Sequence, residues 1–413
     1  MGVREGYKQT EVGIIPEDWR VEPLGSVLGE FPRYGINAPA SGFIDSLPRY
    51  IRITDITEDG HFSEESPVSV NHSMSSSYFV SQNDILLART GASVGKSYIH
   101  RDIATPLVYA GFLIKIKVDS KKASADYVAS YLKTGSYWQW VKVTSQRSGQ
   151  PGINGQEYAR LPVPLPPLPE QKAIAAALSD ADELIAGLEA LVAKKRAIKQ
   201  GAMQQLLTGR KRLPGFVGGC AGTVGDLIDL APQRKRHTPQ LAYVFIGMED
   251  VSESGGLLNQ HIIRPDEIRS GLTYFEREDV LVAKITPCFE NGKGANLRGM
   301  NQFSGFGSTE FHVLRANSES DQVYLFFQTQ MSEFRQKLAD EMVGSAGHKR
   351  VPFKAVLNYP LPIVPPLPEQ QAIAAVLSDV DAEIESLQTQ LGKTRALKQG
   401  MMQELLTGRI RLV

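Results

Sequence analysis

The sequence predicts an α+β fold: two α/β domains of shared fold joined by two long antiparallel helices, an intramolecular coiled coil with pseudo-twofold symmetry. The first supporting observation is a near-duplication, because 31 of the 48 positions from Pro166 to Leu213 recur, without a gap, 199 residues later. The second is that short apolar runs alternate with turns before each copy and lead into a helix-like stretch. The third is a set of weaker echoes between the two preceding regions, which indicates an old internal duplication.

Length and composition describe an ordinary globular chain. Its 413 residues suffice for about two or three domains, and 42% hydrophobic residues can fill their cores. Two cysteines provide neither a disulfide framework nor a metal quartet, so we expect a reducing, cytoplasmic location. No apolar run approaches the roughly 20 residues that span a bilayer, and we expect no membrane association. A formal net charge of zero disfavours a general nucleic-acid coat, although local basic stretches occur at Lys194–Arg212 and Arg234–His237.

Four segments follow one another along the chain. Residues 1–160 form a first head, 161–213 a proline-rich link with the first long helix, 214–360 a second head, and 361–413 a second link and helix. Both heads are expected to contain three apolar strands and then one helix. In the first head these are Tyr50–Ile56, Asp84–Ala88, Phe112–Val118 and Asp126–Val143; in the second they are Tyr243–Ile246, Asp279–Ala283, Glu310–Leu314 and Gln322–Glu341.

The repeated segments read as helices with recognisable ends. Pro169 suits a first helical turn, while Gly209 and Gly408 stand where a left-handed residue closes a helix. Each helix of some 40 residues would be about 60 Å long. Apolar residues at heptad spacing form a seam that requires a partner helix. The candidate positions for this seam, and for docking of partner subunits, are Ile174, Leu178, Ile185, Leu188, Ile373, Leu377, Ile384 and Leu387.

The second copy is the partner we favour for the first helix. Equal repeats related by a twofold axis must run antiparallel, so the end of the second helix returns to the first head. A coiled coil between two chains is the alternative, but both matched seams are present in one chain.

Catalytic motifs are missing from the sequence. Gly91–Ser97 resembles a phosphate-binding loop, but three residues separate its glycines where four are needed. The Asn/Asp-Pro-Pro-Tyr/Phe motif of amino-methyltransferases, a Walker motif and a nucleophile elbow are also missing. We therefore expect no catalytic residue, no metal and no bound cofactor in this chain.

Polar loops are the candidates for recognition. Arginine, glutamine and asparagine carry the forked donors and acceptors that suit guanine and adenine edges in the major groove, and lysine and serine suit phosphates. The first head offers such side chains in its glycine-rich turn and before its proline-rich link, and the second head in corresponding stretches. The candidate residues are Arg89, Ser93, Lys96, Gln146, Arg147, Gln150, Asn154, Lys284, Lys293, His348, Lys349 and Arg350. Taken one by one, each residue is better explained by an ordinary connecting loop, whereas the two loops taken together favour DNA binding.

Together these features resemble the specificity subunit of type I restriction–modification systems. The resemblance covers essentially the whole chain and is strongest in the twin Pro-Pro-Leu-Pro-Glu-Gln helices that end in Leu-Leu-Thr-Gly-Arg. Further carriers of the resemblance are Tyr7–Trp19, Pro23–Gly25, Tyr50–Ile56, Ser148–Asn154 and Gly307–Leu314. One departure stands at the start of the second head, where Cys220–Thr223 replaces a segment like Asp18-Trp19.

The resemblance implies two target-recognition domains, residues 1–160 and 214–360, each reading one half of a bipartite site in double-stranded DNA. It implies that the helices set the spacer between the half-sites and help to dock two modification subunits, which bind S-adenosylmethionine and methylate adenine N6. ATP-driven restriction subunits would join for cleavage, so cofactors and catalysis would belong to partners. Two other classes stay open: an interaction scaffold whose heads bind proteins, and a stand-alone enzyme, which the missing motifs disfavour.

Overall fold

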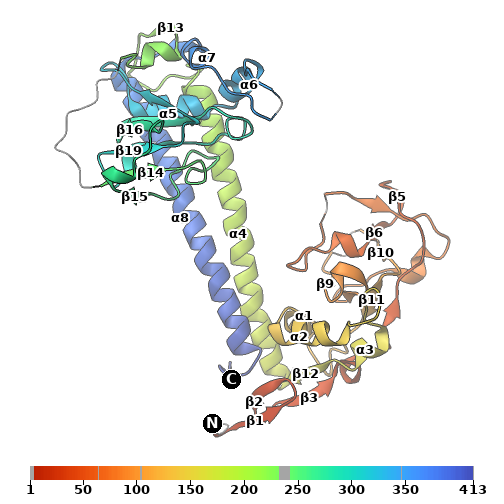
Figure 1. The fold of residues 1–413 in the computed structure, drawn as a ribbon. Helices are drawn as coiled ribbons and strands as arrows, with labels where there is room; N and C mark the ends of the chain where they lie inside the picture. The colour runs from red at the N-terminus through yellow and green to blue at the C-terminus, as the bar shows by residue number, and fades with distance from the viewer. Residues whose placement is uncertain (1–3, 64, 103–104, 232–241, 346, 413) are drawn as a thin grey trace. The chain divides into compact units, whose positions relative to one another are not determined.

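The protein is described here as a computed structural model that covers residues 4–63, 65–102, 105–231, 242–345 and 347–412 (Figure 1). The basic cluster Arg234–His237 lies outside these residues. The chain divides into two compact units: Met1–Glu189 with Thr389–Val413, and Ala190–Gln388. Each unit therefore contains one head and half of each long helix.

The first unit is built on two four-stranded sheets, in the orders β4-β11-β8-β9 and β10-β6-β7-β5, with two smaller pairs, β1-β2 and β12-β3. Its strands are β1 (Tyr7–Thr10), β2 (Gly13–Pro16), β3 (Arg20–Pro23), β4 (Arg33–Tyr34), β5 (Ser41–Gly42), β6 (Arg49–Ile51), β7 (Val68–Ser69), β8 (Ile85–Ala88), β9 (Ser97–Ile99), β10 (Leu107–Tyr109), β11 (Leu113–Ile116) and β12 (Pro162–Leu165). Its head helices are α1 (Ala125–Tyr131), α2 (Gly135–Thr144) and α3 (Gly155–Ala159).

The second unit repeats this plan with sheets β18-β17-β20 and β15-β14-β19-β16 and the pair β13-β21. Its strands are β13 (Cys220–Thr223), β14 (Tyr243–Ile246), β15 (His261–Ile263), β16 (Thr273–Glu276), β17 (Asp279–Ala283), β18 (Gly294–Asn296), β19 (Ser304–Gly307), β20 (Phe311–Arg315) and β21 (Pro360–Val364). Its head helices are α5 (Gln322–Gln330), α6 (Ser332–Asp340) and α7 (Phe353–Leu357).

The two heads share pairings that chance would not repeat. β6 pairs in parallel with β10, and β14 pairs in parallel with β19, while β8 and β17 each pair antiparallel with the strand that precedes the head helices. Each head also closes two turns with an aspartate that accepts a backbone N–H three residues earlier. These donor and acceptor pairs are Arg52 and Asp55, Ser81 and Asp84, Gly247 and Asp250, and Glu276 and Asp279. The shared fold predicted from the weak echoes is confirmed.

The single helix expected in each head is wrong, because each is broken into two. In the first head the Thr134 hydroxyl donates to the carbonyl of Tyr131 at 2.7 Å and accepts the N–H of Tyr137 at 3.3 Å, so α1 ends and α2 begins there. In the second head the extended backbone of Met331 separates α5 from α6. The strand expected at Tyr50–Ile56 also stops early, at Ile51, where the turn closed by Asp55 begins.

The long helices match the prediction closely. α4 (Leu168–Leu206) and α8 (Leu367–Leu405) each contain 39 residues. Gly209 and Gly408 both adopt φ +70°, the left-handed conformation that closes a helix. The helices run antiparallel in each unit and pair within the chain, as ion pairs between them require (Figure 1). These pairs are Lys199–Asp381 and Lys195–Glu383 in the second unit, and Lys398–Asp182 and Arg395–Glu189 in the first.

Candidate functional site

Two stretches of the first head that are far apart in sequence form one surface. The Gly91 N–H donates to the carbonyl of Pro151 at 3.0 Å, and the Ile153 N–H donates to that of Arg89 at 2.9 Å. Gly91 adopts φ +70°, and a Cβ at this position would lie 2.9 Å from Nε2 of Gln150. The glycine-rich turn and the loop before the proline-rich link, both predicted as recognition elements, thus lie side by side.

The candidate side chains on this surface differ in their exposure and in whether they already have a partner within the chain. Gln146 and Gln150 are exposed, and Ser93 is half-buried in the turn. Arg147 is exposed but paired with Glu157 at 2.6 Å. Asn154 has a local role, because its side chain accepts the N–H of Glu157 at 2.9 Å and caps α3.

Lys96 points away from this surface. Its ammonium pairs with Glu58 at 2.6 Å and lies 3.4 Å from the carbonyl of Ile56, inside a separate pocket. Lys293 occupies the matching place in the second head and donates to the carbonyl of Met248 at 2.9 Å. Both lysines therefore hold the segment that follows the parallel strand of their head.

The second head builds the equivalent surface from different side chains. The Thr286 N–H donates to the carbonyl of Lys349 at 3.0 Å, and the Val351 N–H donates to that of Lys284 at 2.9 Å. These bonds correspond to those of Gly91 and Ile153, as the order of segments predicted. Lys284 is half-buried, whereas His348 and Lys349 are exposed.

Arg350 is held firmly in this second surface. Its Nε and Nη2 donate to the two carboxylate oxygens of Glu310 at 2.9 and 2.8 Å, and its Nη1 donates to the carbonyl of His348. The Arg350 hydrogen bonds lower the pKa of Glu310, which keeps its carboxylate charged. His312 lies beneath, where burial lowers its pKa and its Nε2 lies 2.8 Å from the carbonyl of Val351.

Sequence reasoning missed several residues at these surfaces. Glu157 could have been found, because Asn154 and Glu157 have the spacing of a capping box. Glu310, Tyr34 and Phe112 carried no signal, since they reach the loops through strand pairing.

The motif Pro-Pro-Leu-Pro-Glu-Gln places a buried carboxylate at each helix start. Glu170 is fully buried; it accepts from Arg411 Nε and Nη2 at 2.5 and 2.8 Å and from Trp19 Nε1 at 3.2 Å. Arg411 also pairs with Asp18 at 2.8 Å, and these bonds raise the pKa of its guanidinium. The Tyr7 hydroxyl donates to the carbonyl of Gly408, so the tail of α8 returns to the first head as predicted.

The second unit repeats the buried glutamate–arginine pair of this joint. Glu369 is fully buried and accepts from Arg212 Nε at 2.7 Å. The departure noted at Cys220 has its counterpart here: the carbonyl of Gly218, at 2.8 Å, takes the place that Asp18 holds in the first unit. β13, which begins at Cys220, still pairs with β21 as β3 pairs with β12.

The glutamine of the motif connects helix and head. Gln171 accepts the backbone N–H of Ser124, before α1, at 2.9 Å. Gln370 accepts the backbone N–H of Asp321, before α5, at 3.0 Å. Each motif therefore joins three parts: its own helix, the tail of the other helix and a head.

The predicted seam positions lie mostly inside the protein. Ile185 and Leu387 are half-buried, and the other six are buried. Near each helix start they join a head core, together with the end of the other helix. The buried positions are Ile174, Leu178, Leu188, Ile373, Leu377 and Ile384.

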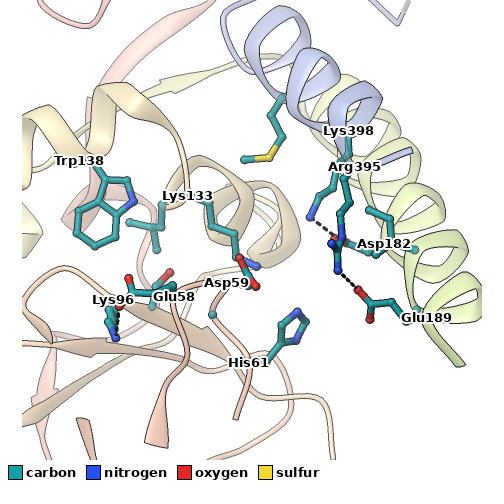
Figure 2. A pocket seen from close by; sticks show the side chains of 16 residues that line it. Glu58, Asp59, His61, Lys96, Lys133, Trp138, Asp182, Glu189, Arg395 and Lys398 are labelled. Carbon is teal, nitrogen blue, oxygen red and sulfur yellow. Dashed lines mark hydrogen bonds and ion pairs between the residues drawn. The ribbon is translucent and has the colours of Figure 1, made fainter. Parts of the chain in front are cut away.

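A pocket of about 740 Å³ lies within the first unit, between the head and the helices (Figure 2). Asp182 and Glu189 of α4 face Lys398 and Arg395 of α8 on one side, and Trp138 of α2 lies on the other (Figure 2). Its acidic and basic side chains are equal in number when His61 is neutral, so the wall has no strong charge preference.

Burial lowers the pKa of Lys133, which lines the pocket, and nearby Lys398 adds to this effect.

Among the described residues, no helix is long and apolar enough to cross a membrane. Over the same part of the chain, no group of three histidine, cysteine, aspartate or glutamate side chains could hold a metal ion.

A family model for the type I restriction modification DNA specificity domain matches residues 16–199 and again residues 222–393. The chain belongs to this family. The two matches fall on the two halves of the internal duplication, each with its own head and helix.

Relatives of this specificity-domain family align along the chain to different extents. A putative type I restriction enzyme MjaX specificity subunit from Methanocaldococcus jannaschii is 26% identical over 433 residues, covering 99% of this chain and 97% of that protein. The type I restriction enzyme EcoEI specificity subunit of Escherichia coli is 34% identical over 158 residues, which cover 38% of this chain but only 26% of that relative.

Solved structures share the fold. A chain from a study of complex assembly and conformational transition of the type I R-M system aligns with a TM-score of 0.54 and 16% identity, covering 96% of this chain and 99% of that one. The type I restriction-modification S subunit from M. genitalium aligns with a TM-score of 0.58 and 12% identity, covering 98% of each chain.

Proposed function

We propose that this chain is the specificity subunit of a type I restriction–modification complex, with each head reading one half of a bipartite site in double-stranded DNA. Residues 1–160 and 214–360 would be the two target-recognition domains. The proposal rests mainly on the specificity-domain match, which occurs twice and falls on two heads of shared fold with equivalent polar loops.

Paired arginines support base reading by these loops. Arg147 is held by Glu157 in the first head, and Arg350 by Glu310 in the second. A guanidinium whose orientation is fixed beforehand loses less conformational freedom when it meets a guanine edge. Exposed Gln146, Gln150, His348 and Lys349 flank the two arginines and would add further base or phosphate contacts.

The long helices would set the spacer between the half-sites. α4 and α8 are continuous over 39 residues each, and ion pairs with buried seam residues hold them together within each unit. A helix pair of this kind resists bending, so two heads attached to it would accept only DNA with one separation between half-sites.

Methylation and cleavage would belong to partners. Two modification subunits would supply S-adenosylmethionine binding and adenine methylation, and restriction subunits would supply ATP-driven cleavage when present. The specificity subunit would itself perform no catalysis, hold no cofactor and act in the cytoplasm.

Exposed apolar residues at equivalent helix positions mark docking surfaces for the modification subunits. Ile198 on α4 and Leu397 on α8 are related by the 199-residue offset and are 46% and 63% exposed. Ile198→Asp is expected to prevent binding of one modification subunit, because a carboxylate at a buried interface is strongly unfavourable. A double variant that also carries Leu397→Asp is expected to prevent binding of both. Native mass spectrometry of the complex measures the stoichiometry. Val217→Asp, at an 85% exposed position outside the helices and strands, is the control, and retention of two subunits by the double variant would exclude this surface.

The whole proposal is tested by co-expressing the chain with its modification subunit and sequencing host DNA for N6-methyladenine. One bipartite motif, with two short halves and a fixed gap, is the expected result. A stable complex that methylates no motif would instead favour a protein-binding scaffold.

A further inference from the structure

Arg89 and Phe112 face each other at one end of the sheet β4-β11-β8-β9. Ala88 pairs with Leu113 across β8 and β11, so the next pair is Arg89 with Phe112, and the Arg89 N–H donates to the Phe112 carbonyl at 3.0 Å. Directly opposed residues project to the same face of a sheet. Phe112 is 56% exposed, so its ring is accessible at the surface.

Tyr34 extends this cluster from the neighbouring strand. Ile114 pairs with Tyr34 across β11 and β4, and the Arg89 guanidinium carbon lies 5.1 Å from the centre of the Tyr34 ring. The Tyr34 hydroxyl accepts the backbone N–H of Gly155. Gly155 directly follows the loop that carries Gln146, Arg147, Gln150 and Asn154, called the recognition loop below. The three side chains of Tyr34, Arg89 and Phe112 form what we call the aromatic patch.

The patch is continuous with the recognition surface. Arg89 donates no hydrogen bond from its buried Nε to any described residue, and its carbonyl accepts the N–H of Ile153. Exposed Arg33 on β4 and exposed Arg147 before the proline-rich link lie near this patch in the chain, and each is paired with a glutamate, Glu30 at 3.1 Å and Glu157 at 2.6 Å. Aromatic rings combined with arginines, rather than ring or charge alone, are typical of binding hot spots.

The second head differs at the equivalent place. Lys284 occupies the position of Arg89, and Glu310 occupies the position of Phe112. The backbone N–H of Lys284 donates to the carbonyl of Glu310, as that of Arg89 does to Phe112. Glu310 in turn holds Arg350. The same position of a shared fold is therefore apolar in one head and charged in the other, as expected of a position that determines specificity.

We propose that Phe112, supported by Tyr34 and Arg89, contacts the C5-methyl group of a thymine in the half-site read by the first head. The inference rests on the proposed function and names a specificity determinant within it. A phenyl ring is one of the side chains that contact this methyl group in the major groove. The second head would read its half-site at this position through charged groups.

The test replaces each thymine of the methylated motif by deoxyuridine, which lacks only the methyl group. Wild-type complex with its modification subunit is expected to bind about fourfold more weakly at one substitution in the first half-site, which corresponds to ~0.8 kcal/mol for one buried methyl-sized group. Phe112→Ala complex is expected to bind the thymine and deoxyuridine duplexes equally at that position. Substitutions in the second half-site should affect both complexes alike.

Phe43→Ala is the matched control, because Phe43 is 45% exposed in the first head but follows β5 in the other sheet. It should keep the wild-type response to deoxyuridine. The inference is overturned if no thymine of the first half-site is sensitive, or if Phe112→Ala keeps the sensitivity. In either case a wild-type complex that still methylates a bipartite motif leaves the proposed function intact, whereas the absence of a motif would remove the proposed function itself.

Discussion

Inserting four residues into α4 between Glu189 and Ala190 is expected to lengthen the preferred DNA spacer and leave both half-site sequences unchanged. Four helical residues add about 6 Å, which is one or two base-pair steps of ~3.4 Å. The insertion point is the boundary between the two compact units, so no residue of either head or of either Glu–Arg joint is replaced. Sequencing of N6-methyladenine in host DNA should show the old motif methylated at least tenfold less than one with a longer gap.

The half-site sequences are the internal control for this variant. Under the proposed function they depend on the loops of the heads, which the insertion does not change. If the variant recognised new half-sites with the old gap, the helices would not act as a spacer and that part of the proposed function would be wrong.

Replacing Arg411 with alanine is expected to destabilise the first unit by about 3 kcal/mol. The change leaves the fully buried Glu170 carboxylate with only the Trp19 N–H, and an uncompensated buried charge is costly. The three tryptophans, Trp19, Trp138 and Trp140, all belong to the first unit, so their fluorescence reports its unfolding selectively. In a urea titration the midpoint should fall by roughly 1 M, taking a slope of about 3 kcal/mol/M.

Arg409→Ala is the matched control, because Arg409 lies two residues away and forms an ion pair at 3.5 Å in which its side chain is 59% exposed. Exposed pairs contribute at most about 1 kcal/mol, so its midpoint should hardly move. Equal midpoints for Arg411→Ala and the wild-type chain would show that the joint does not stabilise this unit.

The sequence predicted the long helices well because their signals are local. Heptad spacing, Pro169 in the first turn and a glycine at each end are read within a few residues, and α4 and α8 follow them. The head helices were less accurate for a physical reason. The break at Thr134 depends on two hydrogen bonds of one hydroxyl, and apolar periodicity does not register it.

The candidate site was predicted in outline but not in its individual side chains. The two matching loops follow from segment order, whereas Lys96 turned out to pair with Glu58 and Asn154 to cap a helix. Tyr34 and Phe112 could not have been chosen, since only strand register brings them to Arg89. Whether the candidate side chains bind DNA remains a prediction.

The glutamines of the twin motifs have an evolutionary consequence. Gln171 and Gln370 accept backbone N–H groups of the heads, from Ser124 and Asp321, rather than bonding to particular side chains. A backbone N–H is present whatever residue occupies the position, proline excepted. Replacement of one head by another would therefore leave these two hydrogen bonds in place, whereas the contacts of Glu170 with Trp19 and of Arg411 with Asp18 depend on side chains of the first head. The glutamine contacts are thus the part of the joint that tolerates a change of sequence in the head.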